Sequence, residues 1–389
     1  MQETAKTYTP ALVIVAYDRP RSLERLLGSV SRAFYEGEVP MVISIDNGGD
    51  PEVLAIAEAF QWEHGPKEVI YREENLGLKN HIRTCGDLSE RFGSIIMLED
   101  DLFVSPWYYE FSQKALDFYG ESEHVAGIAL YKARLNNNAQ KLPFFSLQDG
   151  KDVYFSRMVC SWGQAWTAEM WKGFRAWDKN YTGVRTDLPL PQSIINWKDS
   201  SWVKIFTQYL IETNKFFVYP QLSYTTNFGE AGENFTQLET YFQVNMQMGR
   251  SEPKFCTFED SLSVYDIFYD ILPDRLKRMA PQLEQYDFVV DLYGIKPLDQ
   301  YSAEYVLTQV PVDNPVLSFG RSLVPFEMNV VYQVEGRDIH LAKRTEVMEM
   351  AGSWDPIYNF YYSHIPLKPL TKLASQKLKE KKPFNLIFD

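Results

Sequence analysis

Apolar residues in the first third of the chain follow two alternating patterns. Short unbroken apolar runs predict strands buried on both faces, at Ala11–Ala16, Met41–Ile45, Glu68–Tyr71 and Ile95–Leu98. Between these runs apolar residues recur every three or four positions, as in Leu23, Leu26, Leu27 and Val30, which predicts helices. Strands that alternate with helices in this way predict an α/β fold with a Rossmann-like, mostly parallel sheet. Right-handed crossovers would bring the carboxyl ends of these strands to one edge, which we call the rim.

The pattern changes beyond about Gly120, where strands and helices are no longer evenly interleaved. Further strands are predicted at His124–Tyr131 and Phe216–Tyr219, and further helices at Thr167–Trp177 and Asp199–Thr213. From about Pro253 a second group of strand-like runs begins. We therefore predict two domains, 1–252 and 253–389, of which the second is an additional C-terminal α+β module.

Composition narrows the functional classes. The 389 residues carry a formal net charge of -13, which argues against non-specific nucleic-acid binding because that needs a basic face. Cys85, Cys160 and Cys256 are too few and too widely spaced for a disulfide framework or a zinc site, and fit a reducing compartment. No apolar stretch is long enough for a signal peptide or a membrane span. The expectation is a soluble, cytoplasmic protein, at most peripheral to a membrane.

Three consecutive carboxylates, Glu99, Asp100 and Asp101, directly follow the fourth apolar run. Ligands of open α/β sheets bind at the carboxyl ends of strands, and hard divalent cations prefer oxygen ligands and often accompany phosphate. A metal–diphosphate site is one hypothesis. The other is an acidic loop before a helix that is capped by Ser105, with Pro106 at its first position. The triplet taken alone favours neither hypothesis.

Two other groups are predicted to share this rim. Asp46 ends the second strand, and the turn Tyr17-Asp18-Arg19 ends the first, so an acidic side chain and a turn could hold a nucleotide base. The alternative for Asp46, slightly favoured from chemistry alone, is a turn carboxylate that bonds its own backbone. The chain has neither a Gly-x-Gly-x-x-Gly fingerprint after the first strand nor a Walker-type phosphate loop.

Asp199 and a later loop offer weaker signals. Asp199 precedes a predicted helix, so it is either an N-cap or a carboxylate that accepts a proton from a sugar hydroxyl. The polar loop Asn227–Asn234 either closes over a ligand or is an ordinary surface loop, and the second alternative is somewhat favoured.

Taken together, these segments resemble the GT-A glycosyltransferases, and most closely the inverting enzymes related to the animal N-acetylglucosaminyltransferases that act on mannose. The resemblance covers roughly residues 10 to 240, and the acidic motif of that family is also Glu-Asp-Asp, followed by an apolar residue and an aromatic helix. Its segments are Val13–Pro20, Asp46, Asn75–Gly77, Leu98–Leu102 with Trp107–Tyr109, and Ser161–Trp171, which is similar to the family's Gly-Trp loop and the helix after it.

The resemblance implies how the donor is held. Asp101 would ligate Mn²⁺ or Mg²⁺, which also binds the diphosphate of a UDP-sugar. Glu99 and Asp100 would contact the donor ribose or sugar, and Asp46 would hold the uracil. The turn of Tyr17, Asp18 and Arg19 would line the base, and Lys79 would reach the diphosphate.

The resemblance also implies the reaction. Asp199 would be the general base, with Glu169 in reserve as an alternative carboxylate or a donor-sugar contact. The expected activity is metal-dependent, inverting transfer of N-acetylglucosamine or a related hexose from a UDP-sugar to a glycan or lipid-linked glycan, as in bacterial polysaccharide synthesis. One rival, a sugar-nucleotide-forming nucleotidyltransferase, would need a glycine-rich basic loop that Ala16–Pro20 does not provide. The other rival is a non-catalytic carbohydrate- or nucleotide-sugar-binding protein with the same fold.

The end of the chain is basic. Lys372, Lys377, Lys379, Lys381 and Lys382 alternate with Leu373, Leu378 and Phe384. Such a cluster is attracted to anionic lipid, which predicts a peripheral contact with the inner face of a cell membrane. A solvated helix end is the equally weighted alternative.

Overall fold

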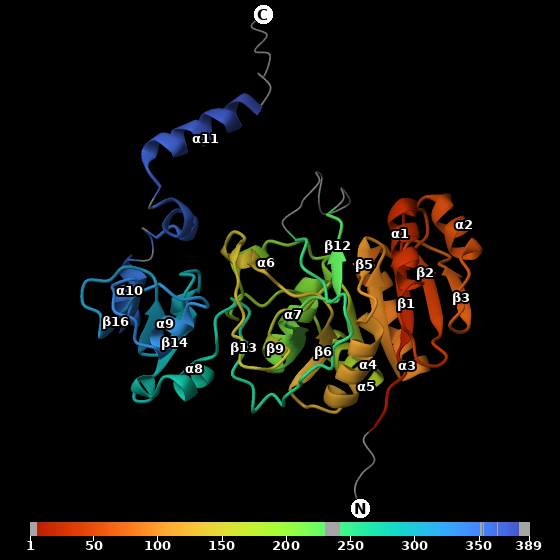
Figure 1. Ribbon diagram of the computed structural model, residues 1–389, viewed down its shortest axis with the longest axis horizontal. Coiled ribbons are helices and arrows are strands. Elements are labelled where there is room, and N and C mark those ends of the chain that lie inside the picture. Colours follow the sequence, from red (N-terminus) through yellow and green to blue (C-terminus); the bar gives the residue numbers. More distant parts are fainter. Residues whose placement is uncertain (1–5, 230–241, 351, 353, 364, 381–389) are drawn as a thin grey trace, which may run out of the picture.

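The computed structural model describes residues 6–229, 242–350, 352, 354–363 and 365–380, and its centre is a nine-stranded sheet (Figure 1). The strand order is β13-β9-β11-β6-β10-β4-β1-β2-β3. Its strands are β1 (Ala11–Ala16), β2 (Met41–Ile45), β3 (Lys67–Tyr71), β4 (Ser94–Glu99), β6 (Val125–Ala129), β9 (Val153–Ser156), β10 (Gln164–Thr167), β11 (Phe216–Pro220) and β13 (Val264–Tyr265). The predicted α/β class with a mostly parallel sheet is confirmed, and β1 and β2 have the predicted bounds.

Helices connect these strands and cover the sheet. They are α1 (Pro20–Val30), α2 (Pro51–Ala59), α3 (Gly77–Phe92), α4 (Tyr108–Tyr119), α5 (Ala168–Asp178), α6 (Gln192–Ile195) and α7 (Trp202–Glu212). Local chemistry starts α2, because the carboxylate of Asp50 accepts a hydrogen bond from the backbone N–H of Glu52 at 2.9 Å and Pro51 occupies the first helical position. Close packing joins α3 to α5, since a Cβ added to Gly86 would lie 2.0 Å from the ring of Trp171.

The direction of the strands defines a switch point. Strands β1, β2, β3 and β4 are mutually parallel, whereas β10 runs antiparallel between β4 and β6. Because β1 lies between β2 and β4, the order of strands along the sheet reverses between β1 and β4. In open α/β sheets the crevice outside such a reversal is the usual place for a ligand.

Strand β10 was not predicted from the sequence. It is only four residues long, and no extended apolar or alternating run marks it. All four residues are nevertheless buried, because β10 lies inside the sheet with Ala165 facing Ile96 on one side and Ile128 on the other. Tertiary pairing rather than local propensity therefore makes this strand.

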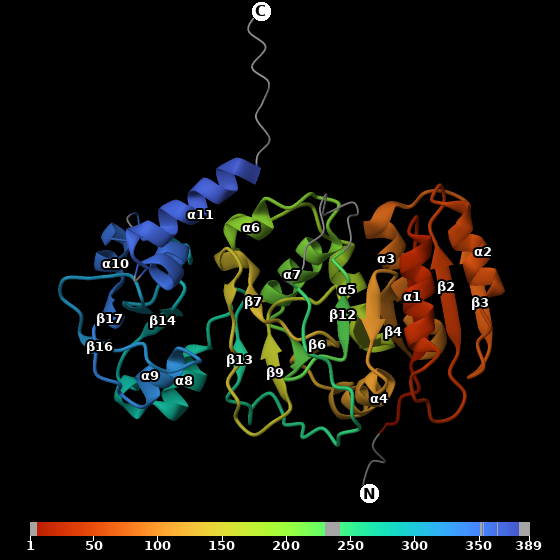
Figure 2. The same ribbon diagram turned by 45° about the horizontal axis from the view of Figure 1, so that its top comes forward.

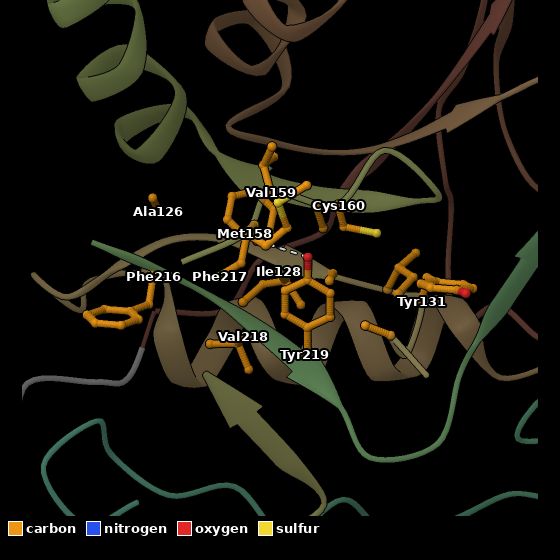
Figure 3. Packing of buried hydrophobic residues seen from close by; sticks show 14 of the residues in the cluster. Ala126, Ile128, Tyr131, Met158, Val159, Cys160, Phe216, Phe217, Val218 and Tyr219 are labelled. Carbon is orange, nitrogen blue, oxygen red and sulfur yellow. Dashed lines mark hydrogen bonds between the residues drawn. The ribbon is translucent and has the colours of Figure 1, made fainter. Parts of the chain in front are cut away.

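The core around β6 and β11 is aromatic as well as aliphatic. Figure 3 shows Ile128 of β6 and Val218 and Tyr219 of β11 packed beside the segment that carries Met158 and Cys160. The hydroxyl of Tyr219 is buried there and donates to the backbone carbonyl of Met158 at 2.9 Å. A buried tyrosine hydroxyl with such a partner fixes this segment without a desolvation penalty.

A second, four-stranded sheet lies at the far end of the molecule from β3 (Figures 1 and 2). Its order is β14-β15-β17-β16, with β14 (Phe288–Asp291), β15 (Tyr305–Thr308), β16 (Leu317–Phe319) and β17 (Ile339–Lys343). The helices of this part are α8 (Pro273–Met279), α9 (Glu327–Val331), α10 (Arg344–Met350) and α11 (Leu367–Glu380). It is the α+β module expected from the sequence.

The boundary between the two parts lies later than predicted. Strand β13 follows residue 253 but pairs with β9 in the large sheet, and the hydroxyl of Tyr119 donates to the carbonyl of Cys256 at 2.7 Å. The segment that leads to β13 thus packs on the first domain. The structure corrects the predicted division at 253, because the chain enters the second sheet only after β13.

Candidate functional site

The ends of three strands meet at the rim. Val15 of β1 lies beside Glu99 of β4, and the backbone N–H of Asp100 donates to the carbonyl of Val15 at 3.1 Å. On the other side of β1, the N–H of Asp46 donates to the carbonyl of Ala16 at 3.1 Å. The acidic triplet and Asp46 therefore flank the end of β1 at the switch point, as the parallel arrangement predicted.

The triplet is not a helix cap. Strand β5 (Leu102–Val104) separates it from α4, which begins only at Tyr108. Ser105 is not the N-cap of that helix, because Trp107 holds that position. Oγ of Ser105 instead accepts a hydrogen bond from the N–H of Trp107 and donates to the carbonyl of Gln247. The helix-cap alternative is therefore wrong.

Arg19 binds two of the three carboxylates. Its Nη1 donates to Oδ2 of Asp101 at 3.0 Å, and its Nη2 donates to Oδ1 of Asp100. Burial alone would lower the pKa of Arg19, but Asp100, Asp101 and Glu99 together raise it above its ordinary value. The guanidinium thus points to the carboxylates. That the turn of Tyr17, Asp18 and Arg19 lines a nucleotide base remains a prediction.

Asp100 faces inward. It is 2% exposed and, besides binding Arg19, accepts a hydrogen bond from the backbone N–H of Tyr17. Burial raises the pKa of Asp100 to about 7, although Arg19 opposes the rise. These bonds hold the turn after β1 in place, so Asp100 orients the turn rather than offering a free carboxylate to a ligand.

Glu99 and Asp101 each retain an oxygen without a partner. Oε1 of Glu99 and Oδ1 of Asp101 are buried and accept no hydrogen bond from the described residues. Burial and repulsion by Asp101 raise the pKa of Glu99 to about 8, with Arg19 opposing them. Buried polar atoms normally have partners, so two orphan oxygens at a switch point indicate a ligand-binding place.

The donor set is compatible with a divalent cation that is shared with a substrate. No group of three or more His, Cys, Asp or Glu side chains forms a closed metal site in the described parts of the chain. Mg²⁺-type ions, however, are commonly held by one or two carboxylates together with substrate phosphates. Oδ1 of Asp101 is a buried carboxylate oxygen of this kind, and it fits such a partial site.

Asp46 is bonded to two segments of backbone. Its Oδ1 accepts from the N–H of Asn47 at 3.0 Å and from the N–H of Leu76, just before α3, at 2.9 Å. The alternative in which Asp46 bonds its own turn is thus confirmed, with the start of α3 as an additional partner. These bonds do not by themselves test a contact with uracil.

The turn beside Asp46 has a polar lining. Nδ2 of Asn75 lies 2.7 Å from the carbonyl of Asn47 and 3.3 Å from the hydroxyl of Tyr17. Tyr17 is 37% exposed, and Asp18 next to it is exposed as well. Gly49 lies against the backbone of Tyr17 so closely that a Cβ there would stand 2.0 Å from the carbonyl oxygen. The structure thus brings Tyr17, Asn47 and Asn75 together around an exposed ring.

A polar cluster under Asp46 was missed in the sequence. Oγ of Ser44 lies 2.8 Å from Nε2 of His81 and accepts from Nη2 of Arg72 at 3.0 Å. Burial lowers the pKa of His81 to about 4, against the attraction of Asp46, so the imidazole is neutral at neutral pH. No sequence signal connects these residues, because they come from β2, the end of β3 and α3.

Lys79 and Asp199 lie close to each other. Nζ of Lys79, in the first turn of α3, is 3.5 Å from the backbone carbonyl of Asp199. The Asp199 side chain is 93% exposed, and its Oδ1 is 3.0 Å from Nζ of Lys204, a lysine that is itself buried. Asp199 is not the N-cap of α7, because Ser201 holds that position and accepts the N–H of Lys204. The N-cap alternative for Asp199 is therefore wrong.

Glu169 lies at the opposite edge of the sheet. It is in the first turn of α5, and the N–H of the preceding Ala168 donates to the carbonyl of Gly93, directly before β4. The six residues of β4 separate that point from the rim by roughly 20 Å at about 3.3 Å per residue. The structure corrects the expectation that Glu169 contacts a donor sugar, since a glutamate side chain cannot span this distance.

The loop before β10 reaches the rim. Oγ1 of Thr225 donates to the carbonyl of Trp162 at 2.5 Å, and the ring of Trp162 packs 4.9 Å from that of Phe242. Gln164 is fully buried, and neither polar atom of its side chain has a hydrogen-bond partner among the described residues. The sequence had indicated this segment only through the Gly-Trp resemblance.

Two segments that are far apart in the sequence meet beside the site. Oγ of Ser193 donates to Oδ1 of Asn138 at 2.7 Å, which joins α6 to the segment between β6 and β9. The predicted closing loop is only partly described: Asn227 ends β12 (Thr225–Asn227), and the N–H of Phe228 donates to the carbonyl of Asp101 at 3.2 Å. Its remaining residues, 230–234, lie outside the described residues.

Comparisons with known proteins identify distant structural likenesses. The chain matches residues 1–349 of S. aureus TarS at 14% identity over 56% of this chain and 59% of that one, with a TM-score of 0.38. It matches the same TarS fragment in complex with UDP-GlcNAc at 12% identity over 57% and 60%, with a TM-score of 0.39. GalNAc-T7 with UDP, GalNAc and Mn²⁺ matches at 11% identity over 55% and 43%, with a TM-score of 0.37.

The sequence comparisons give no family. No protein-family description matches the chain, and no curated protein matches it significantly. The chain spans less than two thirds of the TarS structures it resembles. At TM-scores below 0.5 we base no functional conclusion on these likenesses.

Proposed function

We propose that this chain is a glycosyltransferase that moves a sugar from a UDP-sugar to an acceptor hydroxyl. The observation that carries the proposal is the position of Asp101. Its buried Oδ1, which has no hydrogen-bond partner among the described residues, lies at the strand-order reversal. It is one residue from a backbone hydrogen bond that joins Asp100 to β1. A negatively charged place of this kind suits a cation–diphosphate pair better than a bare anion.

The nucleoside would lie over the ends of β1 and β2. The exposed ring of Tyr17 offers a stacking face for a base, and Asp46 would accept from the uracil N–H. Asp18 stands exposed in the same turn. The bonds from Asp100 to Tyr17 and Arg19 keep that turn in one conformation, so the base would meet a preorganised surface.

The diphosphate would lie over the end of β4. Asp101 would hold Mn²⁺ or Mg²⁺, and Glu99 would contact the donor ribose or sugar. When bound, the cation supplies Lewis-acid stabilisation of the charge that develops on the leaving diphosphate. Arg19 contributes a fixed positive charge beside the same carboxylates. Lys79, in the first turn of α3, would reach the diphosphate.

Asp199 would take the proton from the attacking hydroxyl. It lies at the rim beside Lys79, its side chain faces solvent, and its Oδ1 is 3.0 Å from Nζ of the buried Lys204. Attack from the face opposite the leaving group would invert the anomeric carbon in one displacement. Such a reaction needs no covalent nucleophile on the protein.

The donor and acceptor follow from the resemblance rather than from the site. We propose N-acetylglucosamine or a related hexose as the transferred sugar, and a glycan or lipid-linked glycan as the acceptor. The segments joined by Ser193 and Asn138 would form the acceptor side.

Release of UDP from a panel of UDP-sugars, measured with Mn²⁺ and with EDTA, tests the proposal. We expect turnover of at least one donor with metal, and a loss of about 10²-fold or more in Asp101→Asn, because a charge-stabilising contact is removed. Glu169→Gln is the matched control and should retain activity, since Glu169 lies at the other edge of the sheet.

The same assay, together with calorimetry, also tests the alternative of a non-catalytic binding protein. Such a protein would bind UDP-sugars in calorimetry without releasing UDP, and Asp101→Asn would leave the rate of release at the uncatalysed level of the parent chain. Either result would overturn the proposed activity.

A further inference from the structure

Helix α11 has two chemically different faces. With about 3.6 residues per turn, Leu367, Leu370, Ala374 and Leu378 fall on one side of the helix, and Lys368 and Lys372 fall on the other. Leu373 and Lys377 are at one margin of the apolar side. The sequence from Leu367 to Lys382 contains six lysines and one acidic residue, Glu380, in a chain whose net charge is -13. The side chains of Lys377 and Lys379 are not described, and Lys381, Lys382 and Phe384 lie outside the described residues.

The apolar side of α11 is largely exposed. Leu367 and Leu378 on this side are 75% and 71% exposed, and Leu373 at its margin is 55% exposed. The preceding helical turn, Tyr358–Tyr362, adds the exposed rings of Tyr358, Tyr361 and Tyr362. Apolar side chains grouped in this way on one short stretch are typical of a surface that binds something else.

The basic face has two lysines whose side chains the structure describes, Lys368 and Lys372. No ion pair joins Lys368 or Lys372 to any residue in the described part of the chain. The chain as a whole is acidic, but α11 extends away from the rest of the protein in both views (Figures 1 and 2). The charge of α11 thus remains available to an anionic partner.

Helix α11 and the rim lie toward the same side of the molecule. The chain enters β1 from the bottom of Figures 1 and 2, so the carboxyl ends of β1, β2 and β4 point toward the top. Helix α6, which contacts the acceptor-side segment, and helix α11 both lie toward the top in each view. A flat surface that contacts α11 on this side would face the rim.

We propose that α11, with the tyrosines before it, docks on an anionic lipid bilayer. A helix with leucines on one side and lysines on the other lies in the interface of such a bilayer, with its apolar side in the acyl boundary. The lysines are attracted by the anionic headgroups, whereas a protein partner would need a matching acidic groove for which the structure gives no indication. The docked protein would present its rim to an acceptor carried by lipid, a consequence that rests on the proposed function.

The test is vesicle flotation of the full chain. We expect the protein to float with vesicles of phosphatidylcholine that contain about 30% phosphatidylglycerol, and not with pure phosphatidylcholine. Raising NaCl from about 0.1 M to about 1 M should release it, because the Debye length falls from about 10 Å to about 3 Å. Flotation requires no catalysis, so this proposal and the proposed function can fail separately.

Matched variants identify the surface. Lys368→Gln with Lys372→Gln should weaken binding to anionic vesicles about thirtyfold, at about fivefold per lysine. Leu367→Gln with Leu378→Gln should also reduce it. Lys172→Gln with Lys179→Gln removes the same charge from exposed lysines in and directly after α5 and should leave binding unchanged.

Three results would overturn the proposal. They are failure of the parent chain to float with anionic vesicles, equal flotation of the Lys368→Gln, Lys372→Gln variant, and self-association through α11. Light scattering after size-exclusion chromatography would detect the last as a dimer that becomes a monomer in Leu367→Gln with Leu378→Gln. Circular dichroism of each variant checks that the helix is retained.

Discussion

Nη1 of Arg19 lies 3.0 Å from Oδ2 of Asp101, across 82 residues of sequence. The same guanidinium binds Asp100, so one arginine from the turn after β1 organises two of the carboxylates that follow β4. The ion pair holds the turn and the acidic triplet together. The other oxygen of Asp101, Oδ1, accepts no hydrogen bond from the described residues.

Replacing Arg19 by Met should destabilise the fold. The change leaves Asp100 buried without its cation, and we expect the free energy of unfolding to fall by about 2–4 kcal/mol. Urea denaturation measures this. Adding Asp100→Asn should recover part of the loss, because the uncompensated charge is then gone. If the double variant is no more stable than Arg19→Met, the ion pair does not stabilise the turn as described.

Asp199→Asn should slow transfer without weakening donor binding. A general base contributes about 10²–10⁴-fold to the rate, so kcat should fall by that order while the Kd for the UDP-sugar stays constant. Single-turnover kinetics and calorimetry separate the two quantities. Asp187→Asn is the matched control, since Asp187 is an exposed, ion-paired aspartate between the same two helices, α5 and α7. Equal kcat values for the two variants would assign the base to another residue.

Gly49→Ala should weaken UDP binding. The new Cβ would lie 2.0 Å from the carbonyl oxygen of Tyr17, so the turn after β1 must shift and the ring of Tyr17 must move with it. We expect at least a tenfold increase in the Kd for UDP, about 1.4 kcal/mol, measured by calorimetry. Gly249→Ala is the control, because nothing lies within 4 Å of its added Cβ. Unchanged affinity in Gly49→Ala would show that the turn does not contact the nucleotide.

Glu327 should make stability depend on pH. Its carboxyl is buried and accepts from the hydroxyl of Tyr265 at 3.1 Å, and burial raises its pKa from about 4.5 to about 7. Because the pKa is higher in the folded state than in the unfolded state, protonation of Glu327 stabilises the fold. This contribution to the free energy of unfolding is complete below pH 4.5 and is lost as the pH rises to about 7.

Glu327→Gln, which cannot ionise, reveals this dependence. The parent chain should lose stability relative to the variant between pH 4.5 and pH 7, by at most about 3 kcal/mol, and the difference should level off above that range. Urea denaturation of both proteins at several pH values measures the difference. A difference that does not change with pH would contradict an ionisable Glu327 in this position.

The local pattern of apolar residues was sufficient to predict the main strands and the carboxylates at the rim. The unbroken apolar runs of β1 and β2 have the observed bounds, because a strand buried on both faces needs apolar residues at every position. The same logic placed the acidic triplet and Asp46 at one edge, since parallel strands end together. The resemblance supplied roles for Asp46, Glu99, Asp101 and Asp199, and those roles remain proposals.

Residues whose direction depends on distant partners were not predicted. The turn after β1 would allow Arg19 to point to a base, but Asp100 and Asp101, more than eighty positions away, draw it to themselves. Asp199 looked like a helix cap because the sequence does not show that Ser201 takes that position.

The sequence by itself determined the alternation of strand and helix and the placement of carboxylates after buried strands, because both follow from burial along a single segment. Only the tertiary structure decided that β10 enters the sheet beside β4, that Glu169 lies at the far edge, and that Arg19 compensates the acidic triplet. These features depend on strand register and on ion pairs between remote segments. Their free energies arise only after the chain has folded, so no local pattern records them.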